Sequence, residues 1–332
     1  MSDIDFQTET TGHQKPEFDK ILEVLAEEAQ ENGNIIGTII FYGLSDISAE
    51  QIKRLEPIWR DLPISYKHKM LVAFMDASEA DFDLSYKQVS LLGLKDQNEL
   101  IRAASVDLLW DDESVDTMRL LLDLVQTDDA ASVKARALVA LGKFILLGEY
   151  DEIPESIAKE AQQLAFNLHT DPTQTLEVRR RALEALSNSS HTQKDKLIQQ
   201  AYDSDEHLLK VSSLFAMGRT CDEKWEDFLI DELDNDDNEI IYEAVRACGE
   251  IGLSSSVRQL GELLLEDDRE IQLMVIWSLG EIGGQHAVDI LTTFEENIDD
   301  DDLLEATEDA LGVASFSLSS AMFDFDDYDE AE

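Results

Sequence analysis

The feature that most constrains this chain is a helical motif that recurs about every 31 residues. In each copy, small and large apolar residues lead into a glycine or its substitute. The residue just before this column is apolar in every copy, and the one before that is nearly always small. From the N-terminus the column runs Met75, Trp110, Gly142, Ser187, Gly218, Gly249, Gly280 and Gly312. A repeat of this length predicts stacked supersecondary units that bury one continuous core.

The repeated unit is expected to be a pair of helices. Small residues along one stripe of a helix let a neighbouring helix approach closely, while large residues fill the layer between them. Other amphipathic runs lie between the motif helices and are joined to them by acidic turns at Asp234–Asp237, Asp267–Asp268 and Asp299–Asp302. Aspartate in such turns caps free N–H groups and complements the helix dipole. The sequence therefore predicts an all-α protein.

Two copies, DREIQLMVIWSLGEIG from Asp268 and SVKARALVALGKF from Ser132, match the pattern best. This pattern resembles the short bacterial HEAT-like repeats, which are also found in phycobilisome lyase-type proteins. We therefore predict a right-handed α-solenoid of about eight HEAT-like helix pairs. Such a resemblance specifies architecture well and function poorly, because solenoids serve many unrelated tasks.

The repeats are predicted over residues 45–313, within a solenoid that spans 16–313. Residues 16–44 are expected to form a divergent cap, in which the apolar run IIGTIIFYG is either strand or helix. Residues 1–15 are expected to be disordered, and residues 314–332 to be an acidic-aromatic flexible tail. An insertion at Leu146–Glu160 lengthens one repeat, either as a grip on a partner or as a tolerated surface loop.

The charge balance restricts the partners. The chain has 73 acidic and 26 basic side chains, for a formal net charge of −47. Such a surface repels phosphate backbones and anionic membranes and favours basic partners, although acidity can also serve solubility alone. We expect no direct nucleic-acid binding and no membrane contact. Two cysteines, an acidic N-terminus and the absence of a long apolar run predict a cytoplasmic protein, which we expect to be a monomer.

The cations are unevenly distributed. Eight residues before the column, a basic side chain occurs in five copies and then stops, at Lys67, Arg102, Lys134, Arg179 and Lys210. No Lys or Arg follows Arg269, and the last 63 residues carry 18 Asp or Glu. We therefore expect the turn carboxylates of the last repeats to lack basic partners.

The candidate partner-binding surface lies on three consecutive motif helices. Positions seven and three before the column share a helix face and should point away from the core stripe. In these repeats they form an apolar strip of Val211, Phe215, Tyr242, Arg246, Leu273 and Trp277. Trp, Tyr and Arg often dominate binding energy, so the strip predicts a groove for a basic or amphipathic segment. The alternative is that these side chains are buried between helices.

A second candidate lies in the tail, where the aromatic residues Phe323, Phe325 and Tyr328 alternate with aspartates. The tail resembles the acidic tips of bacterial single-strand DNA-binding proteins, but it lacks their terminal hydrophobic residue. It either binds a basic partner, folds back over the strip, or remains solvated and inactive.

Catalytic signatures are absent from the sequence. It has no phosphate loop, no HExxH, no Cys-x-x-Cys and no nucleophile elbow. We therefore predict no catalytic residue, no metal and no cofactor, and interpret the chain as a non-catalytic scaffold or chaperone-like adaptor. The alternatives are a DNA-mimic-like inhibitor of a nucleic-acid-binding protein and a phycobilin-lyase-like enzyme.

Overall fold

The computed structural model describes residues 16–31 and 36–326, with side chains for residues 16–28 and 36–315. In this part of the chain there are eighteen α-helices and two short 3₁₀-helices, and no strand. The all-α prediction is therefore confirmed. The chain divides into two compact units, Met1–Ala140 and Leu141–Glu332, each of which has its own packing.

The helices of unit 1 follow one another with short connections. They are α1 (Phe18–Glu31), α2 (Thr38–Leu44), α3 (Ala49–Asp61), α4 (Ile64–Ala80), α5 (Lys87–Gly93), α6 (Glu99–Asp107) and α7 (Val115–Thr127). Helix α8 (Ala131–Glu149) crosses the boundary between the units. The apolar run that sequence left open as strand or helix forms α2.

Unit 2 continues the same pattern of helix pairs. Its helices are α9 (Glu155–Thr170), α10 (Leu176–Ser187), α11 (Lys194–Tyr202), α12 (His207–Arg219), η1 (Glu223–Trp225), α13 (Glu226–Glu232), α14 (Asn238–Ile251), η2 (Ser254–Ser256), α15 (Val257–Leu263), α16 (Arg269–Ile282), α17 (Gly284–Glu295) and α18 (Asp301–Asp326). The pairs from α3/α4 to α17/α18 agree with the predicted eight, and α1 and α2 precede them.

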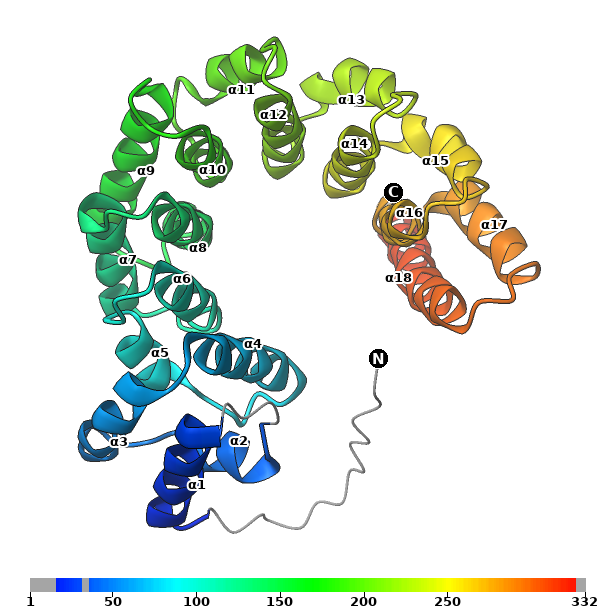
Figure 1. Cartoon of the computed structure of the whole chain (residues 1–332). Coiled ribbons are helices and arrows are strands. Elements are labelled where there is room, and N and C mark those ends of the chain that lie inside the picture. Colours follow the sequence, from blue (N-terminus) through cyan, green and yellow to red (C-terminus); the bar gives the residue numbers. More distant parts are fainter. Residues whose placement is uncertain (1–15, 32–35, 327–332) are drawn as a thin grey trace. The chain divides into compact units, whose positions relative to one another are not determined.

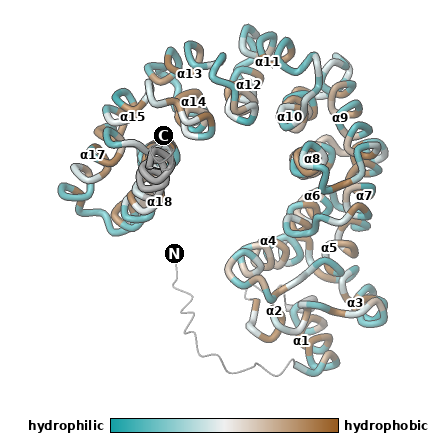
Figure 2. Tube along the Cα trace, turned by 180° about the vertical axis from the view of Figure 1, so that it is seen from behind, coloured by the Kyte–Doolittle hydropathy of each residue, from teal (hydrophilic) through white to brown (hydrophobic). Residues whose placement is uncertain are grey.

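Within unit 2 the helices form two rows. Figure 1 shows α10, α12, α14, α16 and α18 on the inner side of a curve that α9, α11, α13, α15 and α17 follow on the outer side. Apolar and polar stretches alternate along these helices, as Figure 2 shows. The predicted motif helices are the inner row.

The glycine column explains how the inner helices stack. A β-carbon on Gly249 would lie 2.8 Å from the Cα atom of Ser278, and one on Gly280 would lie 3.0 Å from the Ala310 side chain. Each glycine thus faces the small residue that precedes the column in the next repeat. Glycine is required because backbone approaches backbone at these points. The column departs from this pattern at Trp110, which follows the end of α6 at Asp107.

The predicted acidic caps are present in the last repeats. The carboxylate of Asp237 accepts from the first N–H groups of α14, and that of Asp268 does the same for α16. At its other end α14 stops at Gly252, whose φ of 78° lies in the left-handed region. Cap and glycine together define the length of the inner helix.

The basic column forms cross-repeat ion pairs at some of its positions. The Lys67 Nζ atom lies 2.8 Å from Asp96, and the Arg102 guanidinium makes two bonds of 2.7 and 2.9 Å to Asp128. In unit 2, Lys210 lies 2.7 Å from Glu232. The hydrogen bond from Arg102 holds the pKa of Asp128 below its usual range. These buried or half-buried pairs connect the inner helix of one repeat to the next repeat.

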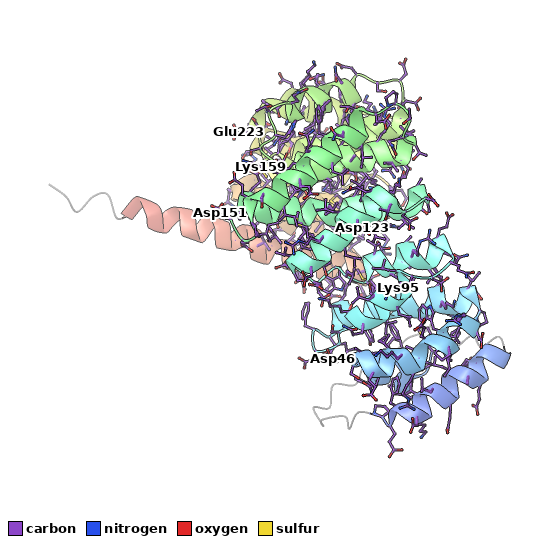
Figure 3. All side chains as sticks on the ribbon, turned by 90° about the vertical axis from the view of Figure 1, so that its left-hand side faces the viewer. Asp46, Lys95, Asp123, Asp151, Lys159 and Glu223 are labelled. Atoms are coloured by element: carbon purple, nitrogen blue, oxygen red, sulfur yellow. The ribbon has the colours of Figure 1, made fainter. Side chains whose placement is uncertain are left out.

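The predicted insertion consists of longer helices and a short turn. Helix α8 continues to Glu149, and α9 begins directly after Pro154, whose φ of −58° suits a helix start. The turn carries Asp151 at a positive φ of 62°. Figure 3 labels Asp151 and, on α9, Lys159, which lies 2.5 Å from Glu155.

Candidate protein-binding surfaces

The six residues of the predicted strip lie on three stacked inner helices: two each on α12, α14 and α16. None of them is fully buried in the core. Leu273 and Trp277 are the most exposed, at 36% and 39%. The strip is therefore uneven, because its α12 and α14 members are half-buried while its α16 members face solvent.

Arg246 is engaged within the protein. Its guanidinium lies over the Phe215 ring, 4.1 Å from the ring centre. The same group bonds to Glu243 at 2.8 Å and to Glu250 at 2.7 Å. A stacked and doubly paired guanidinium is a poor donor for a partner, because binding would first have to break these contacts. Arg246 connects α14 to α12 through its contact with the Phe215 ring.

A cleft of about 350 Å³ lies beside the half-buried part of the strip. Val211, Phe215 and Tyr242 line it together with residues from the start of α14 and α16. Its carboxylates are Glu184, Glu239, Glu243, Asp268 and Glu270. Burial, followed by the negative charge of Glu243, raises the pKa of Tyr242. Burial also raises the pKa of Glu243.

Two arginines of the cleft are already paired. Arg180 and Arg181 both bond to Glu177, and Arg181 also bonds to Glu184 at 2.7 Å. Ser212 on α12 donates a 2.5 Å hydrogen bond to the same Glu184. This cluster closes one end of the cleft and connects α10 to α12. The cleft lining therefore has more carboxylates than arginines, and the additional carboxylates come from α14 and α16 and their caps.

The tail candidates lie beyond the described side chains. Helix α18 continues to Asp326, past the predicted start of the tail at residue 314. The side chains of Phe323 and Phe325 are outside the described residues, and so is Tyr328 entirely. Residues 1–15, predicted to be disordered, also lie outside them.

The expectation that the last turns lack basic partners is wrong at Asp300, which pairs with Arg269, while Asp268 has the neutral partner Asn238. The carboxylates of the last turns do have partners, because the first residue of each inner helix reaches the capping aspartate of the next. His207 lies 3.0 Å from Asp237. In the following repeats, Asn238 donates to Asp268 at 2.6 Å and Arg269 donates to Asp300 at 2.8 Å. We call these three contacts the cap ladder. It was missed because its members occupy a different register from the basic column.

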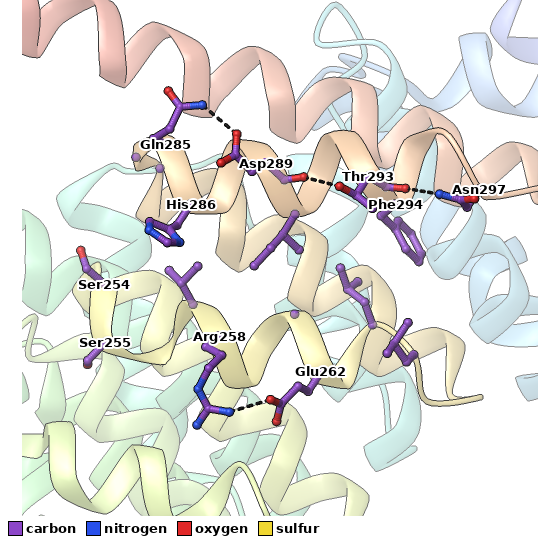
Figure 4. Close-up of a pocket in the computed structure, with 17 residues that line it drawn as sticks. Ser254, Ser255, Arg258, Glu262, Gln285, His286, Asp289, Thr293, Phe294 and Asn297 are labelled. Atoms are coloured by element: carbon purple, nitrogen blue, oxygen red, sulfur yellow. Dashed lines mark hydrogen bonds and ion pairs between the residues drawn. The ribbon is translucent and has the colours of Figure 1, made fainter.

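A larger groove, which the sequence did not indicate, lies on the outer row between α15 and α17 (Figure 4). Its volume is about 950 Å³. Its apolar lining is Val257, Leu264, Leu265, Ile290 and Phe294. Leu265 is 83% exposed and continues this apolar lining. The three consecutive leucines at residues 263–265 were the available signal, because a helix buries only one stripe.

The polar residues of this outer groove lie along its two edges. Figure 4 shows Arg258 and Glu262 on the α15 edge, where they form an ion pair of 2.6 Å. On the α17 edge Gln285 donates to Asp289 at 2.8 Å. Gly261 lies inside the groove, where a β-carbon would approach the end of the Ile290 side chain. The groove thus combines apolar walls with charged edges.

The remaining reactive groups are separate from these surfaces. Cys248 is buried in α14, and burial raises the pKa of its thiol to about 12. Cys221 is exposed and has a positive φ of 49°. Among the described residues, no group of three or more His, Cys, Asp or Glu is arranged to hold a metal ion. Nor does any described helix have the length and apolarity needed to cross a membrane.

The family comparison matches the repeats over α13 to α18. Residues 226–312 match a family model described as HEAT repeats. This chain carries HEAT repeats. The resemblance predicted from the glycine column is confirmed, and the matched segment includes both the outer groove and the Leu273–Trp277 pair. No curated protein sequence matches the chain.

Several solved structures are similar in fold. The complex of CpcE and CpcF of phycocyanin lyase from Nostoc sp. is 14% identical, covers 69% of this chain and 94% of that chain, and has a TM-score of 0.45. Human deoxyhypusine hydroxylase is 14% identical, with 90% and 97% covered and a TM-score of 0.36. Importin beta is 14% identical, with 89% and 41% covered and a TM-score of 0.44. These values say nothing about what the chain binds.

Proposed function

We propose that this protein is a non-catalytic scaffold that holds a basic or amphipathic segment of another protein on the inner helices of its C-terminal HEAT repeats. The observation that carries the proposal is the exposed pair Leu273 and Trp277 on α16, next to a cleft with an excess of carboxylates. Solenoids with such rows of helices commonly use them as binding surfaces.

The apolar part of the surface has a defined position. Leu273 and Trp277 are four residues apart and share one face of α16, and Glu270 lies three residues before Leu273 on that face. The Trp277 indole is 39% exposed and makes no hydrogen bond to the described residues. Tryptophan in this setting is a common anchor, because it buries a large area at little entropic cost.

Charge supports a basic partner. The cleft residues Glu239, Asp268 and Glu270 lie at the starts of α14 and α16. The chain has no Lys or Arg after Arg269, and Arg269 itself pairs with Asp300 and Asp302 rather than with these carboxylates. A partner with alternating cationic and apolar side chains would meet both features, and its association would weaken as salt rises.

The test uses a fluorescein-labelled amphipathic peptide of about 18 residues, with Leu on one helical face and Lys on the other. Titrated against the full chain, Trp277→Ala should weaken the inner-row affinity by tenfold or more, about 1.4 kcal/mol or above. Trp277→Phe should recover most of it. The melting temperature of both variants should stay within a few degrees of the parent.

Two results would contradict the proposal. Unchanged peptide affinity in Trp277→Ala would remove the strip as the binding surface. A large loss of stability would show that Trp277 is a packing residue, as the burial alternative requires. A DNA-mimic function would instead leave competition for a nucleic-acid-binding protein unaffected by Trp277→Ala, because it depends on carboxylates alone.

A further inference from the structure

The outer groove between α15 and α17 is a second candidate binding surface. It lies on the outer row, whereas the proposed scaffold surface lies on the inner row of the same repeats (Figure 1). Its apolar walls come from two adjacent outer helices, and Leu265 is left 83% exposed at its end. An isolated leucine needs no explanation, but a leucine continuous with an apolar groove marks an interaction site.

At Gly261 the two helices meet through the Ile290 side chain of α17. Gly261 contributes no side chain from α15, and the nearest group opposite it is the flexible end of Ile290 on α17. Helix α15 is also short, with seven residues, and ends before Leu264 and Leu265. The space between the two helices is therefore filled by few side chains. A third helix can place its ridge of side chains there, as helices pack into grooves elsewhere.

The charges at the edges of the groove indicate which charge a bound segment should carry. Arg258 is the only Lys or Arg among the residues that line the groove, where His286 also lies, and it is paired with Glu262. Asp289 lies on the opposite edge. Glu266 and Asp267 directly follow the first lining segment, and Glu295 and Glu296 lie between Phe294 and Asn297 of the second. The Arg258–Glu262 pair is 77% and 63% exposed, so Glu262 can exchange its partner at little cost. An apolar groove with acidic margins is complementary to an apolar stripe with basic flanks.

We propose that the outer groove binds an amphipathic helix of a partner protein, whose apolar stripe contacts Leu265, Ile290 and Phe294 and whose Lys or Arg residues meet Glu262 and Asp289. The seat extends along α17, whose twelve residues span about 18 Å, or between three and four turns of a bound helix. The inner and outer surfaces then act independently, and one chain holds two segments at once.

The first test measures stoichiometry and affinity with the labelled Leu/Lys peptide on the full chain. Two peptides should bind per chain. Leu265→Gln should weaken the outer site by about tenfold and leave the inner site unchanged. Leu100→Gln in unit 1 is the matched control, because Leu100 is also exposed and lies outside the groove. A version of the peptide with the same composition in scrambled order should not bind the groove.

The second test locates the peptide. A photo-crosslinking residue at Thr293, which lines the groove, should capture the peptide, whereas one at the neighbouring exposed Thr292 should not. The charge contribution is tested by Glu262→Gln combined with Asp289→Asn, which should reduce the affinity about threefold and flatten its salt dependence. Glu223→Gln, on the exposed outer turn before α13, is the control for lost charge alone.

The proposals for the inner and the outer surface can be contradicted independently of each other. If Leu265→Gln and Thr293 crosslinking have no effect while Trp277→Ala abolishes binding, the groove proposal is overturned and the inner surface stands. If Leu265→Gln removes binding and Trp277→Ala does not, the groove stands and the inner surface falls. Binding of a single peptide that neither variant alters overturns both.

Discussion

In unit 2, a β-carbon on Gly249 of the inner row would meet the backbone of Ser278, whereas one on Gly261 of the outer row would meet the Ile290 side chain, nearest at its Cδ1 end. Both glycines lie between helices of successive repeats. The inner contact is between two backbones, which cannot move without separating the helices. The outer contact is with a flexible tip, which can rotate away. The inner row therefore carries the stacking, and the outer row retains space for a partner.

The largest expected effect comes from breaking an inner contact. Gly249→Ala should destabilise the chain by about 1–3 kcal/mol, because the new methyl group forces α14 away from α16. Urea unfolding at equilibrium measures this loss. Gly312→Ala is the control, since among the described residues no atom outside its own helix backbone lies within 4 Å of the added carbon. That variant should gain about 0.5–1 kcal/mol from helix propensity.

A glycine-to-alanine substitution in the outer groove tests whether the outer helices tolerate an added methyl group better than the inner helices. Gly261→Ala should change the free energy of unfolding by no more than about 0.5 kcal/mol, because Ile290 can adopt another rotamer. A loss as large as that of Gly249→Ala would show that the outer helices are packed as tightly as the inner ones. The groove would then be too rigid to admit a helix.

A smaller effect concerns the contact between the rows, where His169 on α9 meets α10. Its Nδ1 atom lies 2.9 Å from the Arg179 carbonyl oxygen. Burial lowers the pKa of His169, so the folded chain favours the neutral ring. The unfolded chain binds the proton more readily, and stability present above about pH 6.5 is lost as the pH falls below that value.

Between pH 7.5 and 5.5 this single site should lower the free energy of unfolding. His169→Gln keeps a hydrogen-bond donor but does not titrate, so its loss of stability over the same range should be smaller than that of the parent. Unfolding curves at the two pH values measure the difference. Equal losses in both chains would assign the pH dependence to other groups.

A salt-dependent effect is expected at the cap ladder, which connects the starts of successive inner helices. Arg269→Gln removes the last cation of the chain from Asp300, and the pair is exposed. The stability should fall by less than about 1 kcal/mol, and the difference should vanish at high salt. Arg258→Gln on the outer row is the matched control and should cost less. A greater loss at Arg269 would mean that the cap ladder rivals the glycine contacts.

Much of the fold was accessible from sequence because stacked repeats depend on local patterns. The glycine column, the small residues before it and the acidic turns each recur along the chain, and each has a contact that explains it. Gly280 faces Ala310, and Asp268 caps α16. The boundary of the tail is less certain from pattern alone, since α18 extends to Asp326.

The binding surfaces were only partly predictable. The strip positions share a face by helical periodicity, so their placement on three stacked helices followed from the pattern. Their exposure did not, because Arg246 stacks on Phe215 and pairs with two glutamates. Whether a guanidinium is offered to a partner depends on residues from two other turns and another helix. The identity of the residue at position 246 therefore does not predict whether its guanidinium is available to a partner.

By itself, the sequence determined the helix pairs, the glycine contacts and the excess of acid at the C-terminal end, because each depends on residue type and spacing. Only the tertiary structure showed which neighbouring helices pack tightly and which leave a groove between them. Gly249 belongs to the recurring column and Gly261 does not, but only the structure shows that one faces a neighbouring backbone and the other the Ile290 side chain. That difference arises from how far apart the helices lie, and helix separation is set by all the side chains between them together.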